Sequence, residues 1–170
     1  RTIDELDMFN GSPDRYDWQL IGKKELYIPF NNYKAHSAEA TLDKLMQKHH
    51  LNPEYLRYEL HRVWVVEATL KEGKRHIYGK RVFFIDEDSW QITVAENYDK
   101  RGDLWRIAEG FSINYYENPL QQYVLEFQYD LNSNRYFVAG MHDGLPPVDF
   151  NTKHSLKDFK PSAIQRLGVQ

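Results

Sequence analysis

The chain has 170 residues, a formal net charge of −3 at pH 7 and no cysteine. This length indicates roughly one domain, and the lack of cysteine excludes disulfides and thiolate metal sites. The mild acidity argues against nucleic acid as the main partner, and no apolar run approaches the ~20 residues of a membrane helix.

Residues 1–53 show a mixed, irregular pattern. Apolar and polar residues alternate over 16–20, which predicts a short strand, and a second strand is expected over 25–30. The spacing of apolar residues over 38–50 predicts a helix with Ser37 as its N-cap. The chain begins with Arg1 and carries no basic-then-apolar leader, so we expect it to be part of a longer protein.

Residues 54–142 read as a run of six strands joined by short polar turns. Such turns predict a meander, and therefore an antiparallel sheet. Long, twisted strands with one apolar side curl, so we expect a strongly curved sheet or an incomplete barrel. The expected strands cover residues 58–70, 75–86, 91–98, 105–115, 123–131 and 136–141.

Residues 143–170 are polar and contain Pro146, Pro147 and Pro161, which predicts a loop-rich tail. The fold class expected is therefore mainly β with minor α: a curved antiparallel meander with a short covering helix. All 170 residues are expected to form a single domain.

The histidines and acidic turns give weak signals for a metal site. His61 and His76 lie near the two ends of a predicted hairpin and could face each other, although two surface histidines are the more common outcome. The turn Asp86–Asp88 could hold a hard cation, but it lacks the alternate spacing and the glycine of a calcium loop. We therefore predict no metal site and no cofactor.

Catalytic motifs are also missing from the sequence: there is no G-x-S-x-G elbow, phosphate loop or dinucleotide fingerprint. Glu67, Glu96 and Glu109 interrupt expected strands, and two facing carboxylates could support glycoside hydrolysis. Such glutamates more often pair with cations on neighbouring strands. We predict no catalytic residues and no enzymatic activity, with a glycan- or lipid-acting enzyme as an alternative.

Aromatic and aliphatic side chains recur on successive expected strands. The simplest interpretation is a core covered by the 38–50 helix and the tails. Because one short helix shields only part of a long sheet, a partly covered apolar face would form a groove for acyl chains or other hydrophobic ligands. On a convex face the same aromatics would favour sugar stacking. The candidate ligand-binding residues are Trp64, Val66, Phe84, Trp105, Ile107, Phe111, Ile113, Tyr123, Leu125 and Phe127.

Three stretches together resemble a Gram-negative bacterial family of unknown function that is described as outer-membrane lipoprotein-sorting-like. The resemblance covers about residues 10–142. The stretches are Asp14-Arg15-Tyr16-Asp17-Trp18 through Lys23-Lys24-Glu25-Leu26-Tyr27-Ile28-Pro29, Leu56 through Ala68 (LRYELHRVWVVEA), and Arg75 through Trp90 (RHIYGKRVFFIDEDSW).

The resemblance implies a fold similar to the lipoprotein carrier LolA and the receptor LolB, an incomplete barrel with helices over its concave apolar face. Family members look like longer exported chains with a signal peptide, so this sequence would be their C-terminal part, in the periplasm or at the outer membrane. They are often encoded beside predicted outer-membrane channel proteins and export pumps. The family supplies no catalytic residues.

We therefore expect a non-enzymatic binder or carrier of lipid, lipoprotein acyl chains or another hydrophobic ligand in the cell envelope. The principal alternative is a structural module that docks an outer-membrane channel protein or associates with a second copy of itself as a homodimer.

Overall fold

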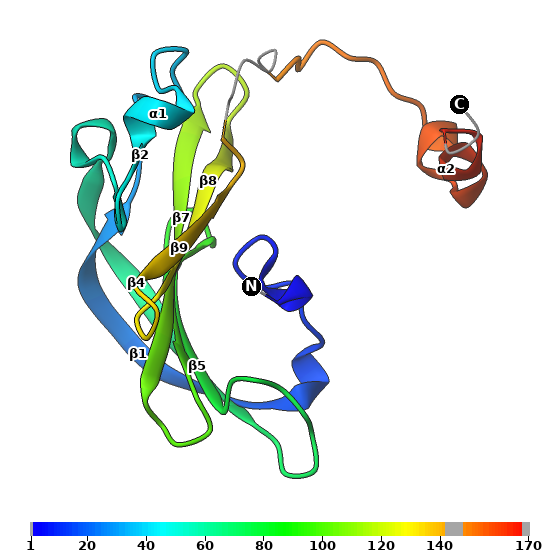
Figure 1. Ribbon diagram of the computed structural model, residues 1–170. Coiled ribbons are helices and arrows are strands. Elements are labelled where there is room, and N and C mark those ends of the chain that lie inside the picture. The colour runs from blue at the N-terminus through cyan, green and yellow to red at the C-terminus, as the bar shows by residue number, and fades with distance from the viewer. Residues whose placement is uncertain (1, 142–147, 168–170) are drawn as a thin grey trace.

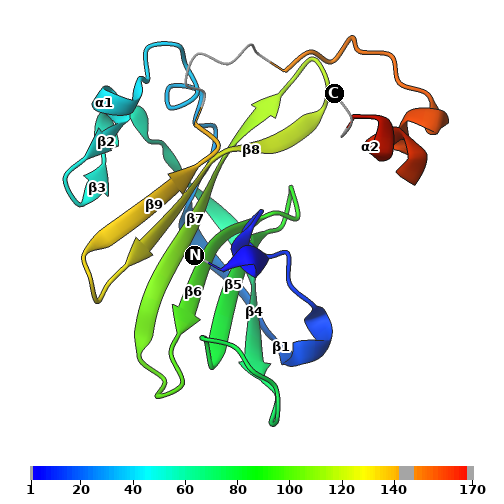
Figure 2. The ribbon, with the colours of Figure 1, turned by 45° about the vertical axis from the view of Figure 1, so that its right-hand side comes forward.

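The computed structural model describes residues 2–141 and 148–167 (Figure 1). Seven strands form one antiparallel sheet in the order β1-β4-β5-β6-β7-β8-β9, and Figures 1 and 2 show that the sheet is strongly curved and open. A meander and an incomplete barrel are thus confirmed. The strands are β1 (Tyr16–Pro29), β4 (Tyr58–Leu70), β5 (Lys80–Asp86), β6 (Ile92–Tyr98), β7 (Leu104–Tyr115), β8 (Leu120–Asp130) and β9 (Arg135–Ala139).

Strand β1 joins the two strands predicted over 16–20 and 25–30 into one. It pairs with β4 along its whole length, and the register shifts between Leu20 and Gly22. Gly22 has φ +142°, a conformation that side chains disfavour and glycine adopts readily. The shift leaves Ile21 without a partner, as in a β-bulge, and the strand continues through it.

The sheet has two faces, and different segments cover them. On the first face, Phe83, Ala95 and Ala108 lie side by side on β5, β6 and β7 and are covered by residues 2–15. This segment contains the short 3-10 helices η1 (Ile3–Glu5) and η2 (Pro13–Arg15). Figure 2 shows it in front of β5 and β6.

On the second face, Phe111 of β7 pairs with Leu125 of β8, and both are buried against Leu45 and Leu51 of the 30–57 segment. The Asn32 N–H donates a hydrogen bond to the Ser112 carbonyl across this face at 2.9 Å. Both faces therefore hold part of the core.

The helix predicted over 38–50 is wrong in extent. The structure has a single helical turn, α1 (Leu42–Leu45), followed by a two-stranded hairpin, β2 (Met46–Gln47) and β3 (His50–Leu51), and by the 3-10 helix η3 (Pro53–Tyr55). His49 takes a left-handed φ of +69° in the hairpin turn. Leu45 and Leu51 both reach the core this way, a placement that a continuous helix would not provide.

The C-terminal tail holds two short helices, η4 (Leu156–Phe159) and α2 (Pro161–Leu167), which contact each other and stand apart from the sheet in Figure 1. Of the prolines on which the tail prediction rested, Pro146 and Pro147 lie outside the described residues, and Pro161 begins α2. Among the described helices, none has the length and apolar character needed to cross a membrane.

Candidate functional site

A strip of apolar side chains on the first face stays open to solvent. Three of its members are far more exposed than core residues: Trp18 at 40%, Leu20 at 61% and Trp90 at 70%. Strand pairing places Leu20 beside Val66 and Trp64 beside Ile85, and the Trp64 and Trp90 rings stack with centroids 6.5 Å apart. We call this surface the apolar strip; it comprises Trp18, Leu20, Trp64, Val66, Ile85 and Trp90.

Charged side chains border the apolar strip at the end near Trp64. The Lys23 Nζ lies 4.2 Å from the centre of the Trp64 ring, within range of a cation–π contact. Lys23 and Arg62 each contact the Glu87 carboxylate at 2.5 Å. The hydrogen bond from Lys23, together with Arg62, lowers the pKa of the Glu87 carboxyl. These three charged groups are thus held beside Trp64.

The segment of residues 2–15 covers the part of the first face next to the apolar strip. Met8 is only 1% exposed and packs in the cluster of Ala68, Phe83 and Ala95. The Phe9 ring makes edge contacts with Phe83 at 5.4 Å and with Trp18 at 5.5 Å. The apolar strip is therefore continuous with the buried cluster beneath this segment.

Buried polar groups anchor the same segment. The Asp4 carboxylate accepts a hydrogen bond from Arg81 Nη1 at 2.9 Å and lies 3.1 Å from His76 Nε2. Burial opposes ionisation of Asp4, but hydrogen bonds from His76 and Thr2 and the charge of Arg81 hold the pKa of its carboxyl well below the usual range.

Glu5 makes the second anchor. The Tyr78 hydroxyl donates to the Glu5 carboxylate at 2.5 Å and accepts from Arg106 Nη1 at 3.0 Å. Arg106 in turn donates to Asp130 at 2.9 Å. Burial and the neighbouring Glu5 raise the pKa of Tyr78, so its hydroxyl stays protonated and can act as the donor.

Tyr123 of β8 pairs with Ser112 and therefore lies on the first face, where Gly110 of β7 leaves room for its ring. A Cβ on Gly110 would lie 2.6 Å from Tyr123 Cε1, closer than any real contact. The Tyr123 hydroxyl donates to the Ile92 carbonyl at 2.6 Å. The ring thus lies across β7 and joins β8 to β6.

We expect Gly110→Ala to destabilise the protein by about 1–3 kcal/mol, because the added methyl group must displace this ring from a packed site. Urea denaturation measures the change in the free energy of unfolding. The double variant Gly110→Ala/Tyr123→Leu provides the control, since the smaller side chain removes the clash. A loss in the double variant equal to the sum of the two single losses would contradict this explanation.

The predicted ligand-binding residues divide between the two faces. Trp64, Val66 and Tyr123 lie on the first face. Trp105 is the extra residue where the register shifts between β6 and β7, and its indole N–H donates to Asp130 at 3.0 Å. The others lie on the second face: Phe84, Ile107, Phe111, Ile113, Leu125 and Phe127.

The predicted residues on the two faces also differ in how far their side chains are exposed to solvent. On the second face Phe84, Phe111, Ile113 and Leu125 are at most 4% exposed, so they belong to the core of the folded chain. The exposed members of the apolar strip that were not predicted are Trp18, Leu20 and Trp90. The alternation over 16–20 places Trp18 and Leu20 on one side of a strand, but it does not reveal that β4 is the pairing partner.

His61 and His76 do not face each other. His61 Nδ1 lies 2.9 Å from Asp86, whereas His76 contacts Asp4. His61, Asp86 and Asp88 offer possible metal ligands within 4.8 Å of one another. The other Asp86 oxygen, however, accepts hydrogen bonds from the Ser89 N–H at 2.9 Å and hydroxyl at 2.6 Å, so the carboxylate already closes its turn.

The three strand glutamates each have a partner of their own. Glu67 contacts Lys80 at 3.5 Å, while Glu96 accepts from the Tyr98 hydroxyl at 2.6 Å and Glu109 from the Tyr58 hydroxyl at 3.1 Å. Cross-strand pairing with a cation is thus confirmed for Glu67, whereas tyrosines take that place for Glu96 and Glu109.

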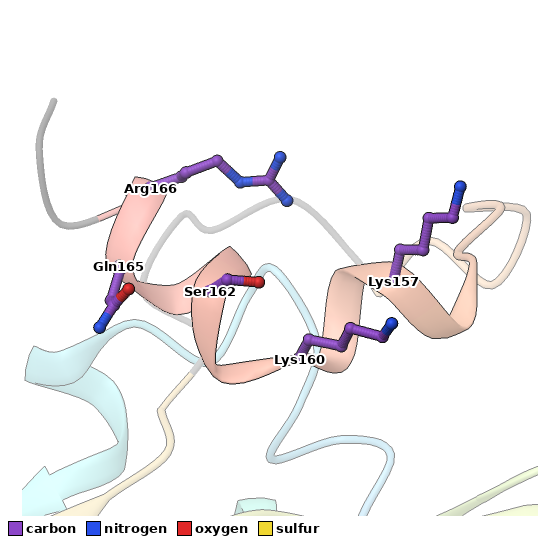
Figure 3. A pocket seen from close by; sticks show the side chains of 5 residues that line it. All are labelled: Lys157, Lys160, Ser162, Gln165 and Arg166. Carbon is purple, nitrogen blue, oxygen red and sulfur yellow. The ribbon is translucent and has the colours of Figure 1, made fainter.

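A separate pocket lies on the C-terminal helices, far from the apolar strip in sequence. It has a volume of about 730 Å³ and is lined by Lys157, Lys160, Ser162, Gln165 and Arg166. Figure 3 shows the three basic side chains extending outward from the two helices. Every residue that lines this pocket carries a charged or polar group, and three of them are basic.

Comparison with known proteins identifies a family, a relative and two similar solved structures. The family model described as "Protein of unknown function (DUF1329)" matches residues 1–165. An uncharacterized protein of Pseudomonas aeruginosa is 48% identical over 171 residues, which cover 100% of this chain and 38% of that relative. The chain therefore spans well under half of the relative's length.

Two solved structures are similar in part. A putative outer membrane lipoprotein-sorting protein domain from Vibrio parahaemolyticus has a TM-score of 0.48 and 14% identity, over 86% of this chain and 50% of that one. A DUF1329 family protein from Desulfovibrio piger has a TM-score of 0.47 and 15% identity, over 89% and 48%.

Proposed function

The chain belongs to the DUF1329 family of proteins of unknown function, and from that premise we propose that it is a non-enzymatic binder or carrier of a hydrophobic ligand, with the apolar strip as its contact surface. The observation that carries the proposal is the exposure of Leu20 and Trp90 beside the buried cluster around Phe83. Lipid and lipoprotein acyl chains are the expected ligands. The expected location is the periplasm or the outer membrane, with a channel protein as a partner.

The chemistry of the apolar strip supports this role. Removing an acyl chain from water is favourable by about 0.8 kcal/mol per CH₂ group. A surface that is open along one side also allows the chain to leave, as a carrier requires. Of the residues predicted from the sequence, Trp64 and Val66 lie in the strip and Tyr123 lies on the same face.

A first measurement is native mass spectrometry of the protein purified from a bacterial host, followed by organic extraction. A bound species of lipid mass, released on denaturation, would support the proposal and identify the ligand class. An empty dimer would favour the alternative, in which the exposed strip or the edge strands β1 and β9 dock a second copy or another protein.

The proposal is tested directly by Leu20→Glu/Trp90→Glu. We expect this double variant to bind a nonionic dodecyl detergent, below its micelle concentration, at least about tenfold more weakly, because two charges would lie where the alkyl chain contacts the strip. Calorimetric titration measures the affinity. Both side chains are exposed, so the free energy of unfolding should change by less than about 1 kcal/mol.

Tyr116→Glu is the matched control, since Tyr116 is 69% exposed in the turn between β7 and β8. It should bind the detergent as the unmodified protein does. Unchanged binding by the Leu20/Trp90 double variant would exclude the apolar strip as the contact surface. Failure of the unmodified protein to bind any hydrophobic probe would refute the proposed function.

A further inference from the structure

Residues 4–9 present two kinds of side chain to the first face in a fixed order. The carboxylates of Asp4 and Glu5 enter a polar cluster, and Met8 and Phe9 then enter the apolar cluster beside the strip. Glu5 and Met8 are each only 1% exposed. The space that the segment fills against the first face, its hollow, therefore holds anionic groups at one end and apolar groups at the other.

The polar end of this hollow contains a fully buried arginine. Arg81 is 0% exposed, and its Nε donates to Asn97 at 2.9 Å. The segment supplies two further hydrogen-bond acceptors: Nη1 donates to the Asp4 carboxylate at 2.9 Å and Nη2 to the Met8 carbonyl at 3.5 Å. A buried guanidinium that loses a carboxylate partner strongly favours another anion in its place.

Two further groups line this polar end. His76 contacts Asp4, and the Tyr78 hydroxyl donates to Glu5 while accepting from Arg106. These donors belong to the loop before β5 and to β7, so they remain with the sheet if the segment moves. An incoming carboxylate or phosphate would find the same donors that now hold Asp4 and Glu5.

The apolar end has a floor of small side chains. Ala68, Ala95 and Ala108 are at most 2% exposed and lie with Phe83 beneath Met8. Phe9 stands between this floor and Trp18, where the apolar strip begins. An unbranched alkyl chain that replaced Met8 and Phe9 would continue without interruption along the strip toward Leu20 and Val66.

The segment's own backbone is not relaxed in this position. Asp7 and Met8 both adopt left-handed φ values, +49° and +64°. Such conformations are uncommon for residues other than glycine and are unfavourable relative to extended or helical ones. Asp7 and Met8 could adopt more favourable φ values if the segment left the hollow. The segment would stay attached to β1 through the turn Asn10–Pro13.

We propose that residues 4–9 are a built-in competitor that occupies the site of an anionic amphiphile, a single alkyl chain with a carboxylate or phosphate headgroup, and that the ligand binds by displacing them. The headgroup takes the place of Asp4 and Glu5 beside Arg81 and Tyr78, and the alkyl chain takes the place of Met8 and Phe9. This inference rests on the proposed function and adds the ligand class and the means by which the empty site is covered.

The experiment compares three dodecyl probes by calorimetric titration of the full chain: laurate, dodecyl phosphate and dodecyl maltoside, each below its micelle concentration. The first two carry the two headgroup types, and the third is uncharged. Hydrogen exchange of residues 2–10 reports displacement, because the Asn10 amide is held by the Asp4 carbonyl at 2.8 Å and the Glu5 amide by the Thr2 carbonyl at 3.1 Å.

We expect at least one anionic probe to bind more tightly than the maltoside and to accelerate exchange of residues 2–10 by about tenfold or more. Asp4→Asn/Glu5→Gln, which weakens the competitor, should bind that probe about tenfold more tightly. Arg81→Gln should bind it at least about tenfold more weakly while its affinity for the maltoside stays the same.

Asp14→Asn is the control for charge near the N-terminus, because Asp14 contacts Lys74 at the surface and not the buried cluster. It should leave all three affinities unchanged. Which anionic probe binds identifies the headgroup as a carboxylate or a phosphate. If Arg81→Gln does not fold, the Asp4/Glu5 variant still tests the inference.

Tight binding of an anionic probe with unchanged exchange over residues 2–10 would overturn the inference and leave the proposed function standing. The inference would also be overturned, and the proposed function would stand, if the charged and uncharged probes bound with equal affinity and the Asp4/Glu5 change had no effect on that affinity. No binding of any probe to the unmodified protein or to the Asp4/Glu5 variant would overturn both.

Discussion

Replacing Phe111 with alanine is expected to lower the free energy of unfolding by about 3–5 kcal/mol. The Phe111 ring is 0% exposed and packs in the second-face cluster with Leu45, Leu51 and Leu125. Truncation would leave a cavity that strands β7 and β8 cannot close, because both are paired on each side. Urea denaturation followed by circular dichroism measures the loss.

Phe137→Ala is the matched control for this prediction. Phe137 is the same residue type on the neighbouring part of the sheet, but its side chain is 48% exposed. We expect a loss of less than about 1.5 kcal/mol there, since little buried area is removed. If Phe111→Ala kept its stability and instead lost ligand binding, Phe111 would be a ligand contact rather than a core residue.

The second large effect is expected at Arg81. Arg81→Met should destabilise the protein by about 3 kcal/mol, because removing one partner of a buried ion pair leaves the other charge uncompensated. The abandoned partner is Asp4, whose side chain is 12% exposed, and Asn97 also loses its donor. Chemical denaturation at pH 7 measures the change.

A double-mutant cycle separates the ion pair from the packing of the arginine. Arg81→Met/Asp4→Asn should recover about 1–2 kcal/mol of the loss, because asparagine carries no charge. The contribution of Asp4 is fully present above about pH 4 and declines as the pH falls, because the pKa of its carboxyl is lowered by folding. Strict additivity of the two single effects would show that the Arg81–Asp4 pair contributes nothing.

The sheet was predictable because its connections are local. The turns between β5 and β9 are short and mostly polar, and runs of apolar residues mark the strands on either side of them. The connection from β4 to β5 is longer, since β5 begins at Lys80 and not at residue 75 as predicted, and the buried Tyr78 lies in this connection. The pairing of β1 with β4 has no such signal, since the 30–57 segment lies between them. For that reason the sequence did not indicate that Trp18 and Leu20 lie beside Ala68 and Val66.

The face of the sheet on which each side chain lies was harder to predict than the positions of the strands. Trp64 and Phe84 look equivalent in the sequence, yet Trp64 pairs with Ile85 and Phe84 with Val65, which puts the two aromatics on opposite faces. Register shifts between β6 and β7 and between β7 and β8 add a further residue at each point. Parity counted along separate strands therefore cannot define one continuous surface.

The buried polar cluster was beyond sequence reasoning for another reason. Asp4 and Arg81 are 77 residues apart in the chain, and Glu5 and Tyr78 are 73 apart. In the sequence, Asp4 and Glu5 lie in a polar stretch that shows no motif, and Arg81 is expected to be a cation on the surface of a strand. They meet because residues 2–15 fold back over the first face of the sheet.

The order of the strands also bears on how the chain folds. Neighbours from β4 to β9 are joined by connections of nine residues or fewer, so each hairpin can form with little loss of loop entropy. Strand β1 must close the whole 30–57 loop to reach β4, and residues 2–15 need the finished floor of β4 to β8 before they can dock. The meander is thus expected to be the folding nucleus, and the N-terminal segment is expected to be the last part to assemble and the first to detach.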